Sequence, residues 1–114
     1  MPDFQWDTGN IKHVIQDYPE RQNTIEEIES VFDDPNFNPV PDRLDSRGEQ
    51  QYSGVGLSNQ NRLLFVAFSF RDGYIRPFSC RPASRKSRNQ YDRDSQETDR
   101  EKPPEGDSQT DSRD

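Results

Sequence analysis

The stretch RLLFVAFSF, from Arg62 to Phe70, decides the fold of this 114-residue chain. It is almost continuously apolar and rich in Phe, which predicts a central strand covered on both faces. Short turn sequences flank it, Asn59-Gln60-Asn61 before and Arg71-Asp72-Gly73 after. The segments beyond those turns, 49–58 and 74–81, therefore pair with it in a three-stranded antiparallel meander.

Two amphipathic segments precede the meander and predict helices. Asp7 can cap the first helix, which runs to about Tyr18 and is ended by Pro19. The second begins at Thr24, which with Glu27 matches the capping-box pattern, and we expect the Glu27 side chain to face water or to favour the positive start of the helix. Both helices have one apolar stripe to bury against a sheet.

The remaining segments complete an α+β chain. Residues 3–6 are a short strand candidate, and the proline-containing segment 33–48 is interpreted as a loop. Residues 83–91 predict a short basic helix at the C-terminal end. The order predicts an antiparallel sheet with two N-terminal helices on one face and a short C-terminal helix.

Composition limits how much of the chain can fold. Only 26% of the residues are hydrophobic and 32% are charged, too few apolar groups to offset the entropy of ordering every residue. Residues 92–114 contain no aliphatic or aromatic side chain. The sequence therefore predicts one domain over residues 1–91 and a disordered acidic polar tail over 92–114.

Charge is distributed unevenly. The chain has a net charge of −7, yet residues 62–91 carry seven Arg and Lys residues against Asp72 alone. A concentrated basic region in an acidic protein indicates a surface for a polyanion or an acidic partner.

The residue inventory argues against several classes of protein. Cys80 is the only cysteine, so no intramolecular disulfide can form and a reducing cytoplasm is the expected compartment. One His and one Cys do not make a zinc site of the usual kind, and we expect no metal or cofactor. No signal peptide is evident, and the longest apolar run is too short for a membrane span.

Motifs spread over residues 3–91 carry a family resemblance. They are, in order, Phe4-x-Trp6-Asp7, Glu26-Glu27-x-x-x-Val31-Phe32-x-Asp34-Pro35, Gly56-Leu57-Ser58, Arg62-Leu63-Leu64-x-Val66, Ile75-Arg76-x-Phe78-Ser79-x-Arg81-Pro82-Ala83-Ser84-Arg85-Lys86, and Tyr91. The chain resembles the BrnT family within the RelE-like ribonuclease toxins.

This resemblance implies a RelE-like fold and a role as the toxin of a bacterial type II toxin–antitoxin system. Such a toxin cleaves RNA without a metal ion and is neutralised by a ribbon-helix-helix antitoxin, through which alone the complex contacts DNA. Direct DNA binding by the chain is the weaker expectation, because no DNA-reading motif is visible.

The sequence also departs from the family pattern. Glu20-Arg21-Gln22 stands where the family usually shows Lys-His-Gly, although the chain keeps the form Trp-Asp-x-Gly-Asn-x-x-His, which ends at His13. Two glutamines follow Glu49 where the family tends to have an arginine. These departures leave open a second interpretation, a catalytically degenerate module that only pairs with a protein partner.

Metal-free RNA cleavage needs a proton acceptor, cations around the phosphate and a proton donor. His13 is the only side chain that titrates near neutral pH without perturbation, and Glu49 is the carboxylate alternative. Guanidinium groups match phosphate geometry. The predicted catalytic residues are His13, Glu49, Arg76, Arg81 and Arg85, and the predicted RNA-binding residues are Lys12, Arg62, Lys86 and Tyr91.

Each prediction has a simpler structural alternative. His13 can be a partly exposed structural histidine beside the apolar stripe, and Glu49 can protect an edge strand from pairing. The arginines can form a solvated face, and Cys80 is better explained as a small buried apolar residue than as a nucleophile.

Overall fold

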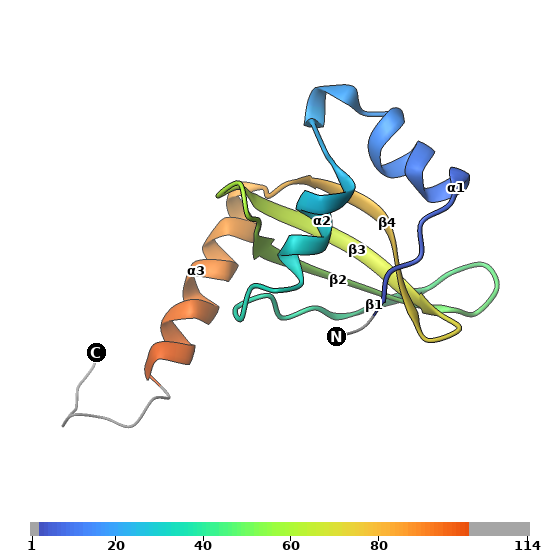
Figure 1. The fold of residues 1–114 in the computed structure, drawn as a ribbon. Coiled ribbons are helices and arrows are strands. Elements are labelled where there is room, and N and C mark those ends of the chain that lie inside the picture. Colours follow the sequence, from blue (N-terminus) through green and yellow to red (C-terminus); the bar gives the residue numbers. More distant parts are fainter. Residues whose placement is uncertain (1–2, 101–114) are drawn as a thin grey trace.

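The computed structural model describes residues 3–100, and Figure 1 shows their arrangement. The elements are α1 (Thr8–Ile11), η1 (Lys12–Gln16), η2 (Pro19–Arg21), α2 (Ile25–Val31), β1 (Val40–Leu44), β2 (Gln50–Leu57), β3 (Leu63–Arg71), β4 (Tyr74–Pro82) and α3 (Arg85–Arg100). The predicted α+β class is confirmed.

The sheet is antiparallel, with its four strands in sequence order β1-β2-β3-β4. Strands β2, β3 and β4 are the predicted meander. Phe65 on β3 lies between Val55 on β2 and Arg81 on β4, so these three residues share one face. The neighbours Leu64 and Val66 face the opposite side and are fully buried.

Strand β1 corrects the prediction of a loop over residues 33–48. It pairs with β2 through Val40–Ser53 and Leu44–Gln50. All of its residues are exposed, so it lacks the alternation of apolar and polar residues that marks a half-buried strand. An edge strand also tolerates Pro41, which has no backbone N–H to donate.

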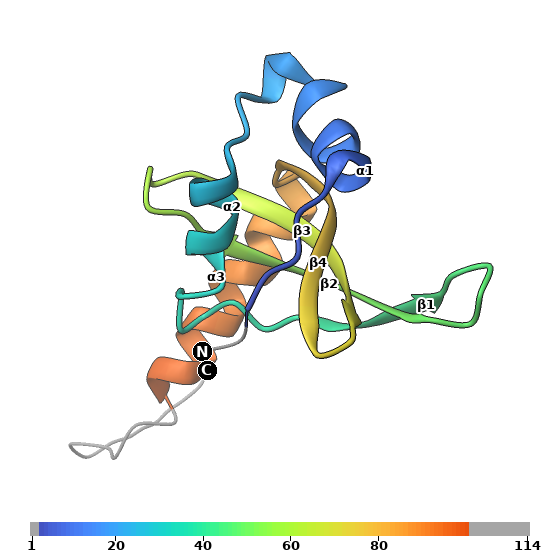
Figure 2. The same ribbon diagram turned by 45° about the vertical axis from the view of Figure 1, so that its right-hand side comes forward.

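The core lies between the sheet and the N-terminal helical segments. Val14 of η1 and Ile28 and Val31 of α2 are fully buried in one cluster with Leu64 and Val66 of β3. Figure 2 shows α2 on one side of the sheet and α3 on the other. Helix α3 contacts the sheet through β2, at one end of the second face.

The first predicted helix is divided into three short elements. Asp7 caps α1 as expected, in a reciprocal pair with Asn10, and the chain continues as the π-helical η1. Pro19 begins η2 instead of only ending a helix. Gln22 follows in the left-handed conformation, with φ 57°, and separates these turns from α2.

Both ends of the described region differ from the prediction. The strand expected at residues 3–6 is a single parallel bridge between Phe4 and Ile75. Helix α3 continues past Tyr91 to Arg100, so residues 92–100 are helical where the sequence predicts a disordered tail, and residues 101–114 lie outside the described residues. No helix in the described region is both long and apolar enough to cross a membrane.

Candidate functional site

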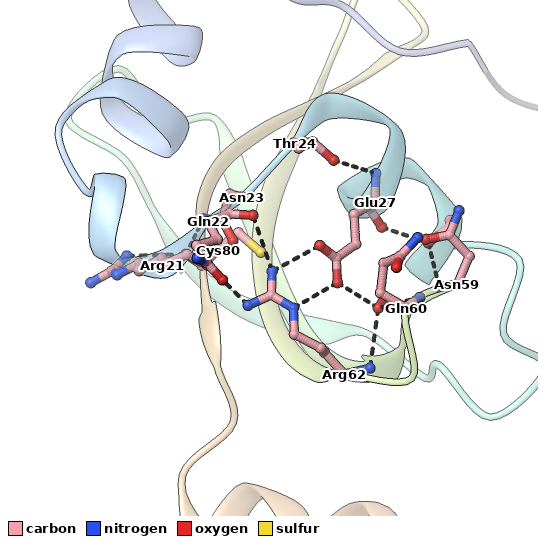
Figure 3. Close-up of polar contacts among 11 residues, drawn as sticks. Arg21, Gln22, Asn23, Thr24, Glu27, Asn59, Gln60, Arg62 and Cys80 are labelled. Atoms are coloured by element: carbon pink, nitrogen blue, oxygen red, sulfur yellow. Dashed lines mark hydrogen bonds and ion pairs between the residues drawn. The ribbon is translucent and has the colours of Figure 1, made fainter.

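A partly buried ion pair joins α2 to the start of β3. Arg62 Nε lies 2.8 Å from Glu27 Oε2, and Arg62 Nη2 lies 2.8 Å from Glu27 Oε1 (Figure 3). Ser58 Oγ donates to Glu27 Oε2 at 2.7 Å, and the Glu27 side chain is 6% exposed. The expectation that Glu27 faces water is therefore wrong. This also leaves the capping box at Thr24 half formed, with only the Thr24 Oγ accepting from the Glu27 N–H.

The pair keeps both partners charged. The hydrogen bond from Arg62 lowers the pKa of Glu27, and Glu27 in turn raises the pKa of Arg62. Because the guanidinium forms two hydrogen bonds to one carboxylate, its charge is compensated inside the protein. Arg62 is thus held as a structural cation, with less charge to offer a ligand than its exposed neighbours.

Further hydrogen bonds join the segment before α2 to Arg62 and to β4. Arg62 Nη1 donates to the Arg21 carbonyl at 2.9 Å, while Arg21 and the buried Asn23 both donate to the Cys80 carbonyl. Burial raises the pKa of the Cys80 thiol to about 12, so it stays protonated at neutral pH. This agrees with Cys80 as a buried apolar residue.

Two pockets flank Arg62. The α2 pocket has a volume of about 390 Å³ and is lined by Gln22, Thr24, Glu27, Gln60 and Arg62. The α3 pocket has a volume of about 360 Å³ and is lined by Leu57, Asn61, Arg62, Leu63, Pro82, Arg88, Tyr91 and Asp92. The structure thus places the predicted RNA-binding residues Arg62 and Tyr91 on one pocket. It adds Arg88, which the sequence analysis counted in the basic region without assigning it a role.

Residues 81–91, which we call the basic segment, carry Arg81, Arg85, Lys86 and Arg88 and no carboxylate. The last three lie exposed on the first turns of α3, which have no acidic residue. Cations are unfavourable there because the helix dipole is positive at its N-terminus. Bound phosphate would relieve that repulsion, so this charge pattern favours an anionic ligand over a purely structural role.

Arg81 connects the basic segment to the second face of the sheet. Its guanidinium carbon lies 4.3 Å from the centroid of the Phe65 ring, a cation–π contact. The Tyr91 phenol donates to Asp34 Oδ2 at 2.7 Å, which fixes the ring at the edge of the α3 pocket. Aromatic rings and guanidinium groups therefore lie together at this end of the sheet.

Arg76 lies apart from the basic segment. It faces Ser69 while Arg81 faces Phe65, four residues along β3, or about 13 Å. Its Nη1 donates to Asp7 Oδ2 at 2.7 Å. This contact, more than any other, lowers the pKa of Asp7 to about 2. The pair joins β4 to the start of α1.

The other predicted residues also lie elsewhere. Lys12 Nζ and His13 Nδ1 lie 2.7 Å and 3.7 Å from the two carboxylate oxygens of Asp17, and the His13 side chain is 74% exposed. Glu49, beside the β1–β2 turn, lies 3.5 Å from Arg71. Within residues 3–100 no hydrogen bond or ion pair links His13 or Glu49 to the basic segment. The predicted catalytic and RNA-binding residues therefore lie in several separate places on the molecule.

Fold and site together define a small α+β protein with a cationic segment at the junction of β4 and α3. The family model described as "Ribonuclease toxin, BrnT, of type II toxin-antitoxin system" matches residues 6–87. The chain belongs to this family, which implies an antitoxin as its partner. No curated protein matches the chain. The matched region includes Arg81, Arg85 and Lys86 and ends before Arg88 and Tyr91.

Proposed function

We propose that the chain cleaves RNA without a metal ion and that the basic segment, with the α3 pocket, is its RNA site. The carrying observation is four cations without a carboxylate over residues 81–91, three of them exposed at the start of α3. Family membership supplies the ribonuclease class. A RelE-like fold and a cytoplasmic location belong to the same proposal.

In this proposal the exposed guanidinium groups stabilise the phosphorane. Arg81, Arg85 and Arg88 approach the scissile phosphate, where negative charge develops as the 2′-oxygen attacks. Lys86 binds a neighbouring phosphate, and Tyr91 stacks on an adjacent base, since single-stranded RNA is recognised largely by stacking. Arg62 shapes the pocket wall while Glu27 holds it in place.

Proton transfer is assigned to His13, which has to reach substrate bound at the basic segment from its exposed position on η1. Glu49 is the alternative base, and it lies between the β1–β2 turn and the start of β2. Removal of whichever side chain transfers the proton, His13 or Glu49, should lower the rate of RNA cleavage by about 10²- to 10⁴-fold, the usual effect of losing such a group.

The test is cleavage of a labelled single-stranded RNA by purified protein in excess chelator. Arg81→Ala and Arg85→Ala should each lower the rate by about 10²- to 10³-fold, the usual effect of losing one preorganised donor. Arg43→Ala, which removes an exposed arginine from β1, should leave the rate unchanged. Equal rates in all four proteins would contradict the proposal.

The separate positions of His13 and Glu49 favour one other candidate, a module that pairs with the antitoxin without catalysis. In that case wild-type protein and the His13→Ala variant would both lack cleavage, while partner binding persists. Cleavage by the wild type that is lost in His13→Ala excludes this candidate.

The antitoxin is proposed to be a ribbon-helix-helix protein, as the family resemblance implies. Co-expression with a ribbon-helix-helix protein encoded beside the chain should yield a stable complex and suppress RNA cleavage. Failure of the two proteins to co-purify would contradict this assignment.

A further inference from the structure

A third pocket lies between α3 and the second face of the sheet, with a volume of about 320 Å³. Val55 and Phe65 form its floor, Asn36 and Asn38 line it from the loop after α2, and Tyr91 lines it from α3. Its volume is within the usual range of small-molecule sites. We call it the sheet pocket, and we propose that it binds a nucleobase of the RNA substrate, which rests on the proposed function.

The first argument is the position of Tyr91. This residue lines both the sheet pocket and the α3 pocket, so the two share a wall. Asp34 Oδ2 accepts from the Tyr91 hydroxyl and from the Leu57 N–H, each at 2.7 Å. The hydrogen bond holds the Tyr91 hydroxyl in place, and the residue lines both the pocket with Arg62 and Arg88 and the pocket with Phe65. An RNA strand with its phosphate at the arginines can place the adjoining base in the sheet pocket.

The second argument is the chemistry of the lining. Phe65 offers an aromatic surface, and the Arg81 guanidinium lies 4.3 Å from its ring centroid, so the floor is continuous with the basic segment. The Asn36 and Asn38 side chains make no hydrogen bond within the described residues. Each amide has both donors and an acceptor for the edge of a base. An aromatic floor with amide groups at the rim suits a nucleobase better than an acidic peptide, because none of the described residues that line the pocket is an Arg or a Lys.

Two serines provide a matched pair of variants. Ser53 and Ser79 both face Ala67, from β2 and β4, and so lie on the same face of the sheet. Of these two serines, Ser53 lines the sheet pocket and Ser79 does not. Ser53→Leu should fill the pocket, while Ser79→Leu adds the same side chain outside it. Asn38→Ala provides a milder change that leaves the strand untouched.

The binding experiment titrates the protein with the four nucleoside 5′-monophosphates and with ribose 5-phosphate, followed by NMR of the Phe65 and Tyr91 rings. At least one nucleotide should give saturable shifts that ribose 5-phosphate does not. Ser53→Leu should weaken that binding by roughly 5- to 150-fold, the equivalent of one lost base stack, and Ser79→Leu should not. Absence of ring shifts, or equal affinity in both serine variants, would overturn the proposal.

Cleavage mapping separates this inference from the proposed function. If wild-type protein cleaves RNA, Asn38→Ala and Ser53→Leu should change the base preferred beside the cut, whereas Ser79→Leu should keep the wild-type pattern. Cleavage with an unchanged pattern in all three overturns the base site and leaves the nuclease. Nucleotide binding at the pocket without any cleavage overturns the nuclease and supports the base site.

Discussion

Glu27 shows how one carboxylate holds the end of the sheet together. Glu27→Gln keeps the side-chain shape but leaves Arg62 without a charged partner. Loss of one member of a fully buried ion pair costs about 3–5 kcal/mol, and since Arg62 is 31% exposed we expect about 2–3 kcal/mol in the free energy of unfolding. Urea denaturation measures this loss. Glu26→Gln, on the exposed side of α2, should change it by less than about 0.5 kcal/mol. Equal stabilities of the two variants would contradict the structural role of the pair.

Asp7 makes a pH-dependent contribution to stability. Arg76, together with backbone N–H groups of α1, lowers the folded-state pKa of Asp7 from 3.8 to about 2. A lowered pKa gives stability that is present above pH 3.8 and is lost as the pH falls through about 2. Asp7→Asn preserves the helix cap and removes the charge, so wild type should be the more stable protein at pH 7.

The measurement compares the melting temperatures of wild type and Asp7→Asn across the acid range. Their difference should narrow between pH 3.8 and 2 and vanish below about pH 2. Asp3→Asn is the control, since Asp3 forms no ion pair within the described residues. A difference that stays constant from pH 7 to pH 2 would show that the Asp7 charge does not stabilise the fold.

At the scale of elements, the Tyr91 hydroxyl is a polar anchor of α3. The helix contacts the sheet at β2, and the Tyr91 hydroxyl donates to Asp34 in the loop after α2. Tyr91→Phe should raise amide hydrogen exchange over residues 88–93 by about 5- to 30-fold, which corresponds to a loss of 1–2 kcal/mol. Exchange in β3 should change less. Tyr74→Phe, in the exposed β3–β4 hairpin, should leave α3 unaffected. Unchanged exchange in Tyr91→Phe would mean that other contacts hold the helix.

The strands that the sequence predicts are those with a buried face. Strand β3 has a continuous apolar run. In β2 and β4 apolar and polar residues alternate, and the turns on either side of β3 predict that these two strands pair with it. Strand β1 escapes prediction because backbone pairing at an edge leaves no hydrophobic signal. The π-helical η1 escapes for a related reason: the sequence keeps helical spacing while the hydrogen bonding changes register.

The candidate site was predictable where charge density alone defines it. The basic segment follows from counting cations, and Tyr91 lies beside it in the chain. Counting cations does not show which arginines form ion pairs with carboxylates. Arg62 and Arg76 are each compensated by a carboxylate that lies far away in sequence, Glu27 and Asp7. Such partners are fixed by the tertiary fold, so a sequence pattern cannot separate structural arginines from those free to bind phosphate.

At the scale of the whole molecule, the net charge of −7 opposes RNA binding except where cations are locally uncompensated. Arg62, Arg71 and Arg76 are all paired with carboxylates within the described residues. Our proposal therefore assigns the attraction to RNA to the basic segment, and it predicts that RNA binding is strongly salt-dependent despite the acidic composition. If the affinity for RNA depends on this one segment, removal of a single positive charge from it should weaken RNA binding measurably.

The salt dependence of RNA binding tests this account most directly. The ligand is single-stranded 2′-O-methyl RNA, which cannot be cleaved through its 2′-oxygen, and affinity is measured over a range of salt concentrations. For Arg85→Ala and Arg88→Ala, the slope of log affinity against log salt should each become shallower by about 0.7, the value for one phosphate contact to a single strand. Arg43→Ala should keep the wild-type slope. Wild-type slopes in both α3 variants would contradict the assignment of the RNA site to the basic segment.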